Sequence, residues 1–301
     1  MNSITNPLVS IIIPTYNHGH FLGRALQSIV DQTYSNWEVY IVDGNSTDNT
    51  TEVVENFIDP RIKYLKTEIK GSIAASRNVG IEAASGEWIA FLDSDDWWKV
   101  DKLETCLKYI TEEVVDLIYH DMEIKYINKG FFNRKKTNSR QLKKPILIDL
   151  LVVNNPIYNS SVVVRKKLLN KIDGLDEKLE LVAVEDYHTW LRIAKLTNNF
   201  FYLPYTLGYY LIHDQNISRK DMSIPTRHAV SEFIKILTQK QKLKLEANMK
   251  YTSGRFNYIN CNYKKAKKEL FFAFKNGNNS IKLRSLIMLI IIPFKFNSFF
   301  L

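Results

Sequence analysis

Three carboxylates within four residues follow a short apolar run near position 90. The run at residues 88–92 is apolar and aromatic enough to form a buried strand. Asp93 and Asp95 come directly after it and share side-chain parity in an extended chain, so both can point at one ion. Carboxylate oxygens suit Mg²⁺ or Mn²⁺, and Mg²⁺ usually takes phosphate oxygens as further ligands. The alternative is a solvated acidic turn, including Asp96, that caps a helix beginning near Lys99.

Other side chains have the chemistry to join such a site. Arg77 carries a guanidinium, which suits phosphate oxygens; otherwise it is a charge on a helix face. His213 can ligate a metal or a phosphate as a neutral imidazole; otherwise it is simply hydrogen-bonded near a strand end. Glu185 and Asp186 begin an expected helix at residues 184–197, where the helix dipole by itself favours acids.

The elements that must position these residues alternate through the first third of the chain. Apolar, β-branched runs predict strands, and helical spacing of apolar residues predicts the helices between them. The expected strands are residues 8–13, 37–42, 61–66 and 88–92; the expected helices are 21–32, a second capped by Ser46 or Thr47 and running to about 58, and 72–84. This alternation is typical of an α/β fold with a parallel sheet and right-handed crossovers.

The loops after these strands meet at one edge of the sheet, where ligands of open α/β sheets bind. They carry Tyr16, Asn17, Asp43 and the acidic cluster, which makes a nucleotide-sized crevice. None of these loops has the G-x-G-x-x-G or G-x-x-x-x-G-K-[ST] pattern, which argues against an ordinary dinucleotide enzyme or a P-loop NTPase.

The pattern loosens after a helix expected at residues 99–112. Short strands are expected at residues 115–120, 122–127, 159–164, 201–203 and 209–213, and a helix or strand at 146–153. The polar, basic segment 129–144 is expected to be a mobile loop. Trp97 and Trp98 either stack on a bound ligand or pack in the core.

The net charge of +9 is unevenly placed. Residues 220–301 hold 16 basic against 4 acidic side chains, a net of +12, which leaves −3 for residues 1–219. A basic segment indicates nucleic acid, an anionic membrane surface or acidic partners. Cys106 and Cys261 lie far apart without metal-ligand spacing, which indicates a reducing compartment, and residues 1–7 lack the apolar core of a secretory signal.

The basic tail reads as helices at residues 228–238, 243–258 and 263–275, with Ser280 as cap of a further one. Residues 281–301 are apolar but interrupted by charges and a proline, and the clean run 286–292 is shorter than the about 20 residues that span a bilayer. This pattern predicts that residues 281–301 form an interfacial helix with basic flanks or, alternatively, a helix packed on the body.

Six pieces in a fixed order carry a resemblance to a known family. They are Pro14-Thr15-Tyr16-Asn17, Val42-Asp43-Gly44-Asn45-Ser46-Thr47-Asp48, Ser76-Arg77-Asn78-Val79-Gly80, Asp93-Ser94-Asp95-Asp96, Glu185-Asp186, and His213 with Ser218. A lone D-x-D is frequent by chance, but six pieces in order at fitting spacing are specific. Residues 9–218 resemble a family 2 glycosyltransferase with the GT-A fold, which uses a nucleotide-sugar.

The resemblance implies a donor pocket, a metal site and a catalytic base. The donor-binding residues would be Pro14, Thr15, Tyr16, Asn17, Asp43, Asn45, Ser46, Arg77, Asp93 and Ser94. Arg77 would lie near the diphosphate, and Mn²⁺ or Mg²⁺ would be held by Asp95, with Asp93 and His213 as further ligands. Asp186 would be the catalytic base; Glu185 as the base, or a helix-cap role for both, are the alternatives.

One departure from the family concerns the nucleotide. The usual V-D-D-G-S becomes Val42-Asp43-Gly44-Asn45-Ser46, so the second acid, which commonly reads uracil, is missing. Base selectivity would then rest on Asp43 or Asn45. A UDP-hexose remains the expected donor, because UDP-sugars are the commonest donors of the family.

The resemblance also implies chemistry and a place of work. A single displacement assisted by one base inverts the anomeric centre, while the metal and Arg77 stabilise the charge of the leaving phosphate. Charge and family together predict a cytoplasmic enzyme, peripherally bound to the inner face of the cell membrane. It would transfer a hexose to a hydroxyl of an oligosaccharide or polyprenyl-diphosphate-linked sugar in O-antigen (lipopolysaccharide) or capsule assembly. Loops such as 129–144 would select that acceptor.

The expected division is a GT-A domain at residues 1–220, with a donor half at about 1–120 and an acceptor half at 121–220, and a helical region at 221–301. A nucleotidyltransferase is one alternative, but it normally has a glycine-rich phosphate loop where Pro14-Thr15-Tyr16-Asn17 stands. A binding module for nucleic acid is another. The tail lacks a zinc pattern or an RNA-binding signature, so no nucleic-acid partner is expected.

Overall fold

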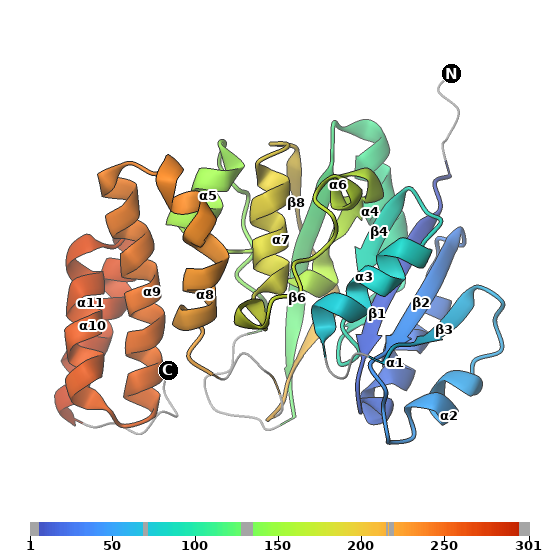
Figure 1. Ribbon diagram of the computed structural model, residues 1–301, viewed down its shortest axis with the longest axis horizontal. Helices are drawn as coiled ribbons and strands as arrows, with labels where there is room; N and C mark the ends of the chain where they lie inside the picture. Colours follow the sequence, from blue (N-terminus) through green and yellow to red (C-terminus); the bar gives the residue numbers. More distant parts are fainter. Residues whose placement is uncertain (1–5, 69–71, 128–134, 215, 217–219, 295–301) are drawn as a thin grey trace.

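A computed structural model of the chain describes residues 6–68, 72–127, 135–214, 216 and 220–294. Its centre is an eight-stranded sheet in the order β3-β2-β1-β4-β7-β6-β8-β5, flanked by helices (Figure 1). The strands are β1 (Val9–Thr15), β2 (Trp37–Asp43), β3 (Ile62–Lys66), β4 (Trp88–Phe91), β5 (Trp97–Trp98), β6 (Leu117–Tyr126), β7 (Val163–Arg165) and β8 (Phe200–Ile212).

Eleven α-helices stand in the described part of the chain. They are α1 (Gly19–Val30), α2 (Thr50–Glu55), α3 (Ile73–Ala83), α4 (Lys102–Glu112), α5 (Ile146–Val152), α6 (Lys166–Lys171), α7 (Glu185–Ala194), α8 (Ser223–Val230), α9 (Gln239–Ile259), α10 (Tyr263–Asn276) and α11 (Asn279–Ile291). Short 3₁₀ helices are η1 (Asn159–Ser161), η2 (Leu179–Leu181), η4 (Ser231–Ile236) and η5 (Ile292–Phe294).

The alternating part of the sheet confirms the expected α/β architecture. Strands β1 to β4 are parallel, and β1 lies between β2 and β4. Successive residues of β1 face opposite layers: Ile12 joins the core under α3 and α7, whereas Ile11 and Ile13 join the core under α1 and α4. Both layers bury almost all of β1, which explains its continuous apolar run.

Strand β1 runs through Pro14 to Thr15, although a stop at Pro14 is expected from the sequence. In β1 the backbone of Ile12 faces β4, since its carbonyl accepts from Leu92 N, so the nitrogen of Pro14 faces the same side. Pairing with β4 ends at Ile12 opposite Phe91. The N–H that Pro14 lacks would therefore have had no partner in β4, and the strand continues.

The second half of the sheet joins segments that the sequence separates. Strand β6 combines the two strands expected at residues 115–120 and 122–127, and β8 combines those expected at 201–203 and 209–213. Their pairing shifts register around Asp121, and Leu203 opposite His120 is followed by Thr206 opposite Asp121. The bulge leaves Pro204 without a ladder partner, which lets a proline sit inside the strand. Residues 159–164 are the helix η1 and the start of β7 rather than one strand.

Two expected caps are wrong, because other residues begin those helices. Helix α2 begins at Thr50 after Asn49, while the Ser46 hydroxyl donates to Asp43 instead. Helix α11 is capped by Asn278, whose side chain accepts from Ile281 N, not by Ser280.

The segment 129–144 lies only partly within the described residues, since 129–134 fall outside them. Its described part is hydrogen-bonded to β6: Lys135 O accepts from Ile124 N, and Thr137 N donates to Met122 O. These bonds hold the segment against the sheet.

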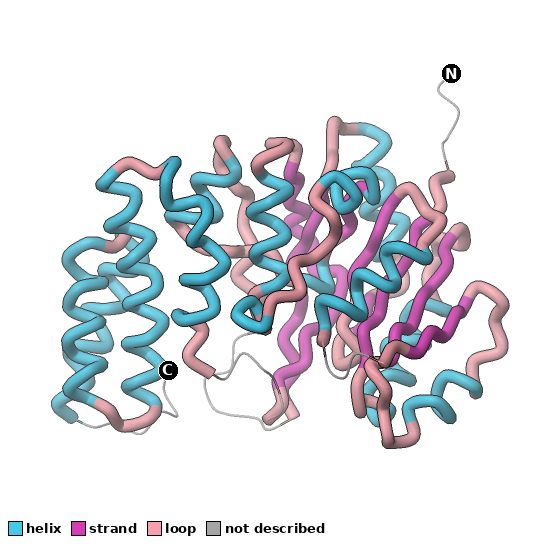
Figure 2. The backbone as a smooth tube through the Cα atoms, viewed as in Figure 1, coloured by secondary structure: helices cyan, strands magenta, loops and turns pink. Residues whose placement is uncertain are grey.

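The C-terminal helices continue the body and then leave it. Residues of α8, η4 and the first half of α9 belong to the same core as α5 and α7. Helices α10 and α11 pack with the end of α9 around a separate small cluster that includes Tyr258, Leu270 and Met288. Figure 2 shows this helical group at the end of the molecule opposite β3 and α2. In the described part of the chain, no helix is long and apolar enough to cross a membrane.

Candidate active site

A cavity of about 310 Å³ opens at the carboxyl ends of β1 and β4, and we call it the first cavity. Side chains from the ends of these strands, from the beginnings of α3 and α7, and from β8 and the turn after it line it. The sequence-predicted residues that it brings together are Pro14, Thr15, Tyr16, Arg77, Asp93, Ser94, Asp95, Glu185, Asp186 and His213. Segments nearly 200 residues apart thus meet at one sheet edge, as parallel topology requires.

The three carboxylates of the acidic cluster have different partners. Asp93 Oδ1 accepts hydrogen bonds from Arg77 (2.7 Å) and Asn159 (3.0 Å). Asp95 Oδ2 lies 2.9 Å from His213 Nε2, so these two side chains face one another at the cavity wall. Asp96 is buried and accepts from the backbone N–H of Leu211, which ties the cluster to β8. Burial, followed by the charges of Asp95 and Asp93, raises the pKa of Asp96 well above its usual range.

Arg77 forms a bridge between two carboxylates rather than a free charge. Its guanidinium is 3% exposed and donates to Asp93 and, at 2.6 Å, to Glu185 Oε1. Burial alone would lower the pKa of Arg77, but the charges of Asp93 and Glu185 outweigh it and raise the pKa. The guanidinium therefore stays charged and holds α3, the end of β4 and the beginning of α7 together.

Glu185 and Asp186 are neighbours with different surroundings. Glu185 is buried and bound to Arg77, and its Oε2 atom is buried without a hydrogen-bond partner. Asp186 lines the cavity and accepts only the N–H of Tyr187 among the described hydrogen bonds, through Oδ1. Burial, and after it the charge of Glu185, raises the pKa of Asp186 to about 7. A carboxylate poised near neutral pH at a cavity wall has the properties of a general base.

Four predicted donor-binding residues do not line the first cavity. Asn17 has a left-handed backbone (φ 53°), and its side chain accepts from Thr47 N. Asp43 accepts from Ser46 through Oδ1 and from Tyr64 OH through Oδ2. The bond between Asn17 and Thr47 ties the loop after β1 to the loop after β2, and the bond from Tyr64 ties the end of β2 to β3. The predicted donor contacts of Asn17, Asp43, Asn45 and Ser46 stay predictions, and Ser218 lies outside the described residues.

The cavity also contains residues that the sequence did not mark as functional, among them the polar side chains His18, Asn159, Tyr210 and Asn216. His18 Nδ1 lies 2.8 Å from Ser94 Oγ, and burial lowers the pKa of His18, which favours the neutral imidazole. A histidine directly after the Pro14-Thr15-Tyr16-Asn17 loop was a signal that the sequence did contain. Asn159 was expected in a strand, which hid its place in η1.

Trp98 packs in the core, as one of the two interpretations predicted, whereas Trp97 is only half-buried. Trp98 is 3% exposed and donates through Nε1 to Ser160 O. Trp97 stacks on Tyr209 and lies under the guanidinium of Arg24. Neither lines the first cavity.

The residues of the first cavity fit a divalent cation. Four carboxylates and one guanidinium line it, an excess of negative charge that a cation would compensate. Asp95 and His213 offer an oxygen and a nitrogen ligand side by side. No three His, Cys, Asp or Glu side chains of the described residues converge on one point, so substrate phosphates would have to complete the shell. The metal role predicted for Asp93 stays a prediction, and its bonds to Arg77 and Asn159 weigh against it.

Known proteins have sequences similar to that of this chain. The chain is 37% identical over 191 residues to the Escherichia coli UDP-Glc:alpha-D-GlcNAc-diphosphoundecaprenol beta-1,3-glucosyltransferase WfgD, covering 64% of this chain and 71% of that one. It is 29% identical over 296 residues to an uncharacterized glycosyltransferase of Haemophilus influenzae, covering 95% and 96% of the two chains.

Solved structures share the fold. The S. aureus TarS 1–349 complex with UDP-GlcNAc matches with a TM-score of 0.65 at 20% identity, covering 95% of this chain and 87% of that one. The mannosyltransferase PcManGT of Pyrobaculum calidifontis, with GDP-Man and Mn²⁺, matches with a TM-score of 0.63 at 16% identity, covering 96% and 85%. The model of glycosyl transferase family 2 matches residues 10–173, more than half of the chain. The chain belongs to glycosyl transferase family 2 and is a glycosyltransferase with the GT-A fold.

Proposed function

We propose that the protein is an inverting hexosyltransferase that uses a UDP-hexose and a lipid-diphosphate-linked saccharide acceptor. The observation that carries the proposal is Asp186, a carboxylate with its pKa raised to about 7 at the wall of a cavity that also holds the Asp95–His213 pair. A base and a pair of metal ligands in one cavity are what a metal-assisted single displacement at a sugar carbon needs.

In this mechanism Asp186 takes the proton of the attacking acceptor hydroxyl. Glu185 is already bound to Arg77, so it is the weaker candidate for the base. The bridge from Arg77 to Glu185 and Asp93 positions the beginning of α7, and with it Asp186, against the end of β4. Attack from the side opposite the leaving diphosphate inverts the anomeric centre.

On the donor side, Asp95 and His213 would hold Mn²⁺ or Mg²⁺ together with diphosphate oxygens. The ion supplies compensation for the negative charge that develops on the leaving diphosphate. Tyr16, which is 41% exposed, offers an aromatic face to the nucleotide base. Asp43 has both carboxylate oxygens bonded within the protein, so any contact with the base through it requires one of these bonds to be shared.

The substrates are proposed from the E. coli relative, whose name specifies a UDP-glucose donor and a GlcNAc-diphosphoundecaprenol acceptor. A donor screen tests the proposal directly. UDP-glucose, UDP-GlcNAc and GDP-mannose are compared for protection against thermal unfolding with and without Mn²⁺, and for nucleotide release on addition of N-acetylglucosaminyl diphosphate bearing a short alkyl chain. We expect a UDP-sugar to protect most and to release UDP. Failure to release UDP from any UDP-sugar, together with release of pyrophosphate from UTP and a sugar 1-phosphate in a parallel assay, would instead indicate a nucleotidyltransferase.

Peripheral association with an anionic membrane is the second part of the proposal. Leu283, Leu286, Ile287 and Ile290 of α11 are between 39% and 60% exposed and repeat at i, i+3, i+4 and i+7, which places them on one face of the helix. Lys282 and Arg284 stand on the same helix, within a region of net charge +12. An apolar helix face with basic neighbours supports binding to anionic lipid headgroups.

A further inference from the structure

A second cavity, of about 380 Å³, lies behind the first one. Five residues line both: Asp93, Asn159, Ala183, Asp186 and Tyr210. The proposed base, Asp186, therefore lines both cavities. The volume lies within the about 300–1,000 Å³ that is usual for small-molecule sites.

The C-terminal helices form one wall of the second cavity. Leu245, Asn248, Met249 and Thr252 stand at i, i+3, i+4 and i+7 of α9, so one face of this helix lines the cavity, and Thr226 of α8 joins them. Asn248 is fixed there because its Nδ2 donates to Val152 O (2.9 Å) and Val153 O (3.0 Å) at the end of α5.

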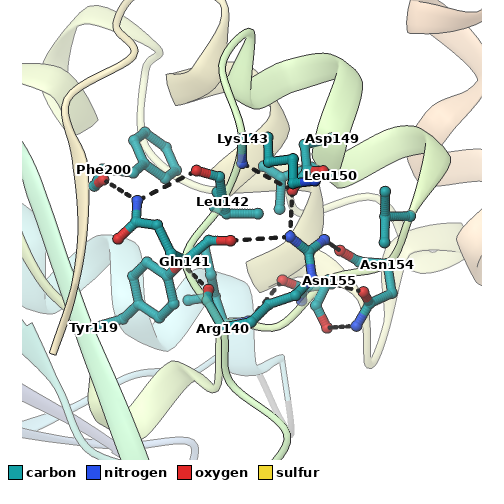
Figure 3. A network of polar contacts seen from close by, with 12 residues as sticks. Tyr119, Arg140, Gln141, Leu142, Lys143, Asp149, Leu150, Asn154, Asn155 and Phe200 are labelled. Atoms are coloured by element: carbon teal, nitrogen blue, oxygen red, sulfur yellow. Dashed lines mark hydrogen bonds and ion pairs between the residues drawn. The ribbon is translucent and has the colours of Figure 1, made fainter. Parts of the chain in front are cut away.

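The loop between α5 and η1, which also lines the second cavity, is held by a polar network centred on Arg140 (Figure 3). Arg140 donates to Asp149 of α5 (2.5 Å) and to the side-chain oxygen of Asn154 (3.2 Å). Asn154 lines the cavity together with Asn155. The loop between α5 and η1 is thus anchored before any ligand arrives, as a binding wall requires.

The lining of the second cavity mixes polar and apolar side chains and contains no Lys or Arg, although the chain has a net charge of +9. A diphosphate would find no cationic side chain there and would be repelled by Asp93 and Asp186, so the lining disfavours a diphosphate as the occupant. Carboxamides of Asn154, Asn155 and Asn248 stand beside apolar side chains such as Leu150 and Met249. A neutral sugar ring has hydroxyl groups that form hydrogen bonds and C–H faces that pack on apolar side chains, so it complements this lining.

We propose that the second cavity is the subsite for the neutral terminal sugar of the acceptor, and that α8 and α9 form the wall that selects it. The inference rests on the proposed function and adds a role in catalysis to the C-terminal helices. The hydroxyl to be glycosylated faces Asp186, while the diphosphate and lipid of the acceptor stay outside the cavity.

The test fills the cavity from the C-terminal side in the full-length protein. Thr252→Phe and, independently, Thr226→Phe place an aromatic ring in it, and Leu243→Phe on the exposed side of α9 is the matched control. Donor binding is measured as the shift in melting temperature that UDP-glucose and Mn²⁺ cause. Transfer is followed with N-acetylglucosaminyl diphosphate bearing a short alkyl chain, and the same diphosphate of a uronic acid is tested as a competitor.

We expect both filling variants to raise the acceptor KM by at least about tenfold, the effect of losing about 1.4 kcal/mol of binding. The donor-induced shift and all constants of Leu243→Phe should stay as in the unaltered protein, and the uronic acid should compete poorly. An unchanged acceptor KM in both filling variants, loss of the donor shift in them, or a preference for the uronic acid would overturn the inference. A protein that binds no nucleotide-sugar in any form would instead refute the proposed function.

Discussion

Asp186 is the residue on which the proposed chemistry depends, and its replacement by asparagine removes the base while keeping the shape. We expect Asp186→Asn to lose about 10²–10⁴-fold in kcat, the usual contribution of general-base catalysis, and to keep donor binding. Steady-state kinetics and the donor-induced thermal shift measure the two effects. If Glu185→Gln is the inactive variant and Asp186→Asn is active, the base is the neighbouring residue.

The raised pKa of Asp186 makes a separate prediction about stability. A carboxyl group that is harder to ionise in the folded state favours folding below its unfolded pKa, and this contribution is lost as pH rises through about 7. Asp186→Asn should therefore melt at a higher temperature than the unaltered protein at pH 8, with the difference shrinking toward pH 4. The kcat/KM of the unaltered protein should rise with pH through about 7, because the base must be ionised. A pH-independent difference in melting temperature would contradict this account.

Arg77 and Glu185 form a buried pair, so removing one partner leaves the other charge uncompensated. We expect Arg77→Met to cost about 3–5 kcal/mol in the free energy of unfolding, as for other broken buried pairs. Glu185→Gln added in the same background should recover part of this loss, because the unpaired charge is gone. Urea denaturation of the single and double variants gives the comparison. An equal loss in both would show that Arg77 acts by packing alone.

At the scale of elements, the close contact between α3 and the sheet fixes where Arg77 lies. A Cβ at Gly80, one turn after Arg77, would stand 2.7 Å from Ile12 Cγ2 and 3.2 Å from Val42 Cγ2. Gly80→Ala should push α3 away from β1 and cost about 1–3 kcal/mol, as other overpacking changes do. It should also lower transfer activity by moving Arg77.

Gly23→Ala in α1 is the control for Gly80→Ala in α3. A Cβ there meets only Val53 Cγ1, at an ordinary 3.6 Å. Gly23→Ala should be neutral or stabilise by up to about 1 kcal/mol through helix propensity. Chemical denaturation of the two alanine variants separates them, and equal stabilities would refute the close packing of α3.

The sequence predicted the elements best where local signals agree with the fold. The strands and helices before Asp93 have strong apolar periodicity and short loops, so their order and parallel arrangement followed from the residues alone. Asp95, Asp186 and His213 were recognisable because their positions within family motifs are local features. The bulge at Pro204 and the helix at Asn159 were not, because both depend on pairing with β6 and packing against β4, far along the chain.

The second cavity was beyond the reach of sequence reasoning for the same reason. Asn154 and Asn248 stand almost 100 residues apart and belong to segments that read as a loop and a basic helix. Nothing local marks them as neighbours. The division at residue 220 also hid that α9 shares the core of α5 and α7.

At the scale of the whole molecule, the exposed face of α11 predicts where the protein binds. Replacing Leu283 and Ile290 together by serine should abolish flotation with phosphatidylglycerol-containing vesicles, because the apolar contribution is lost. High salt should release only part of the unaltered protein, since burial of apolar side chains is not screened. Ile58→Ser, which alters an isoleucine that is 99% exposed and lies outside the helical region, is the control and should float normally. Undiminished flotation of the double variant would exclude α11 as the anchor.

The five residues shared by the two cavities have a consequence for the order of events in a catalytic cycle. With the donor in the first cavity and the acceptor sugar in the second, as proposed, both substrates must be bound together for transfer, and we expect turnover to proceed through a ternary complex. Double-reciprocal plots at several acceptor concentrations should then intersect, whereas a covalent glycosyl-enzyme would give the parallel lines of a ping-pong scheme. Each substrate should also bind more tightly when the other is in place, because each completes the surface on which the other rests.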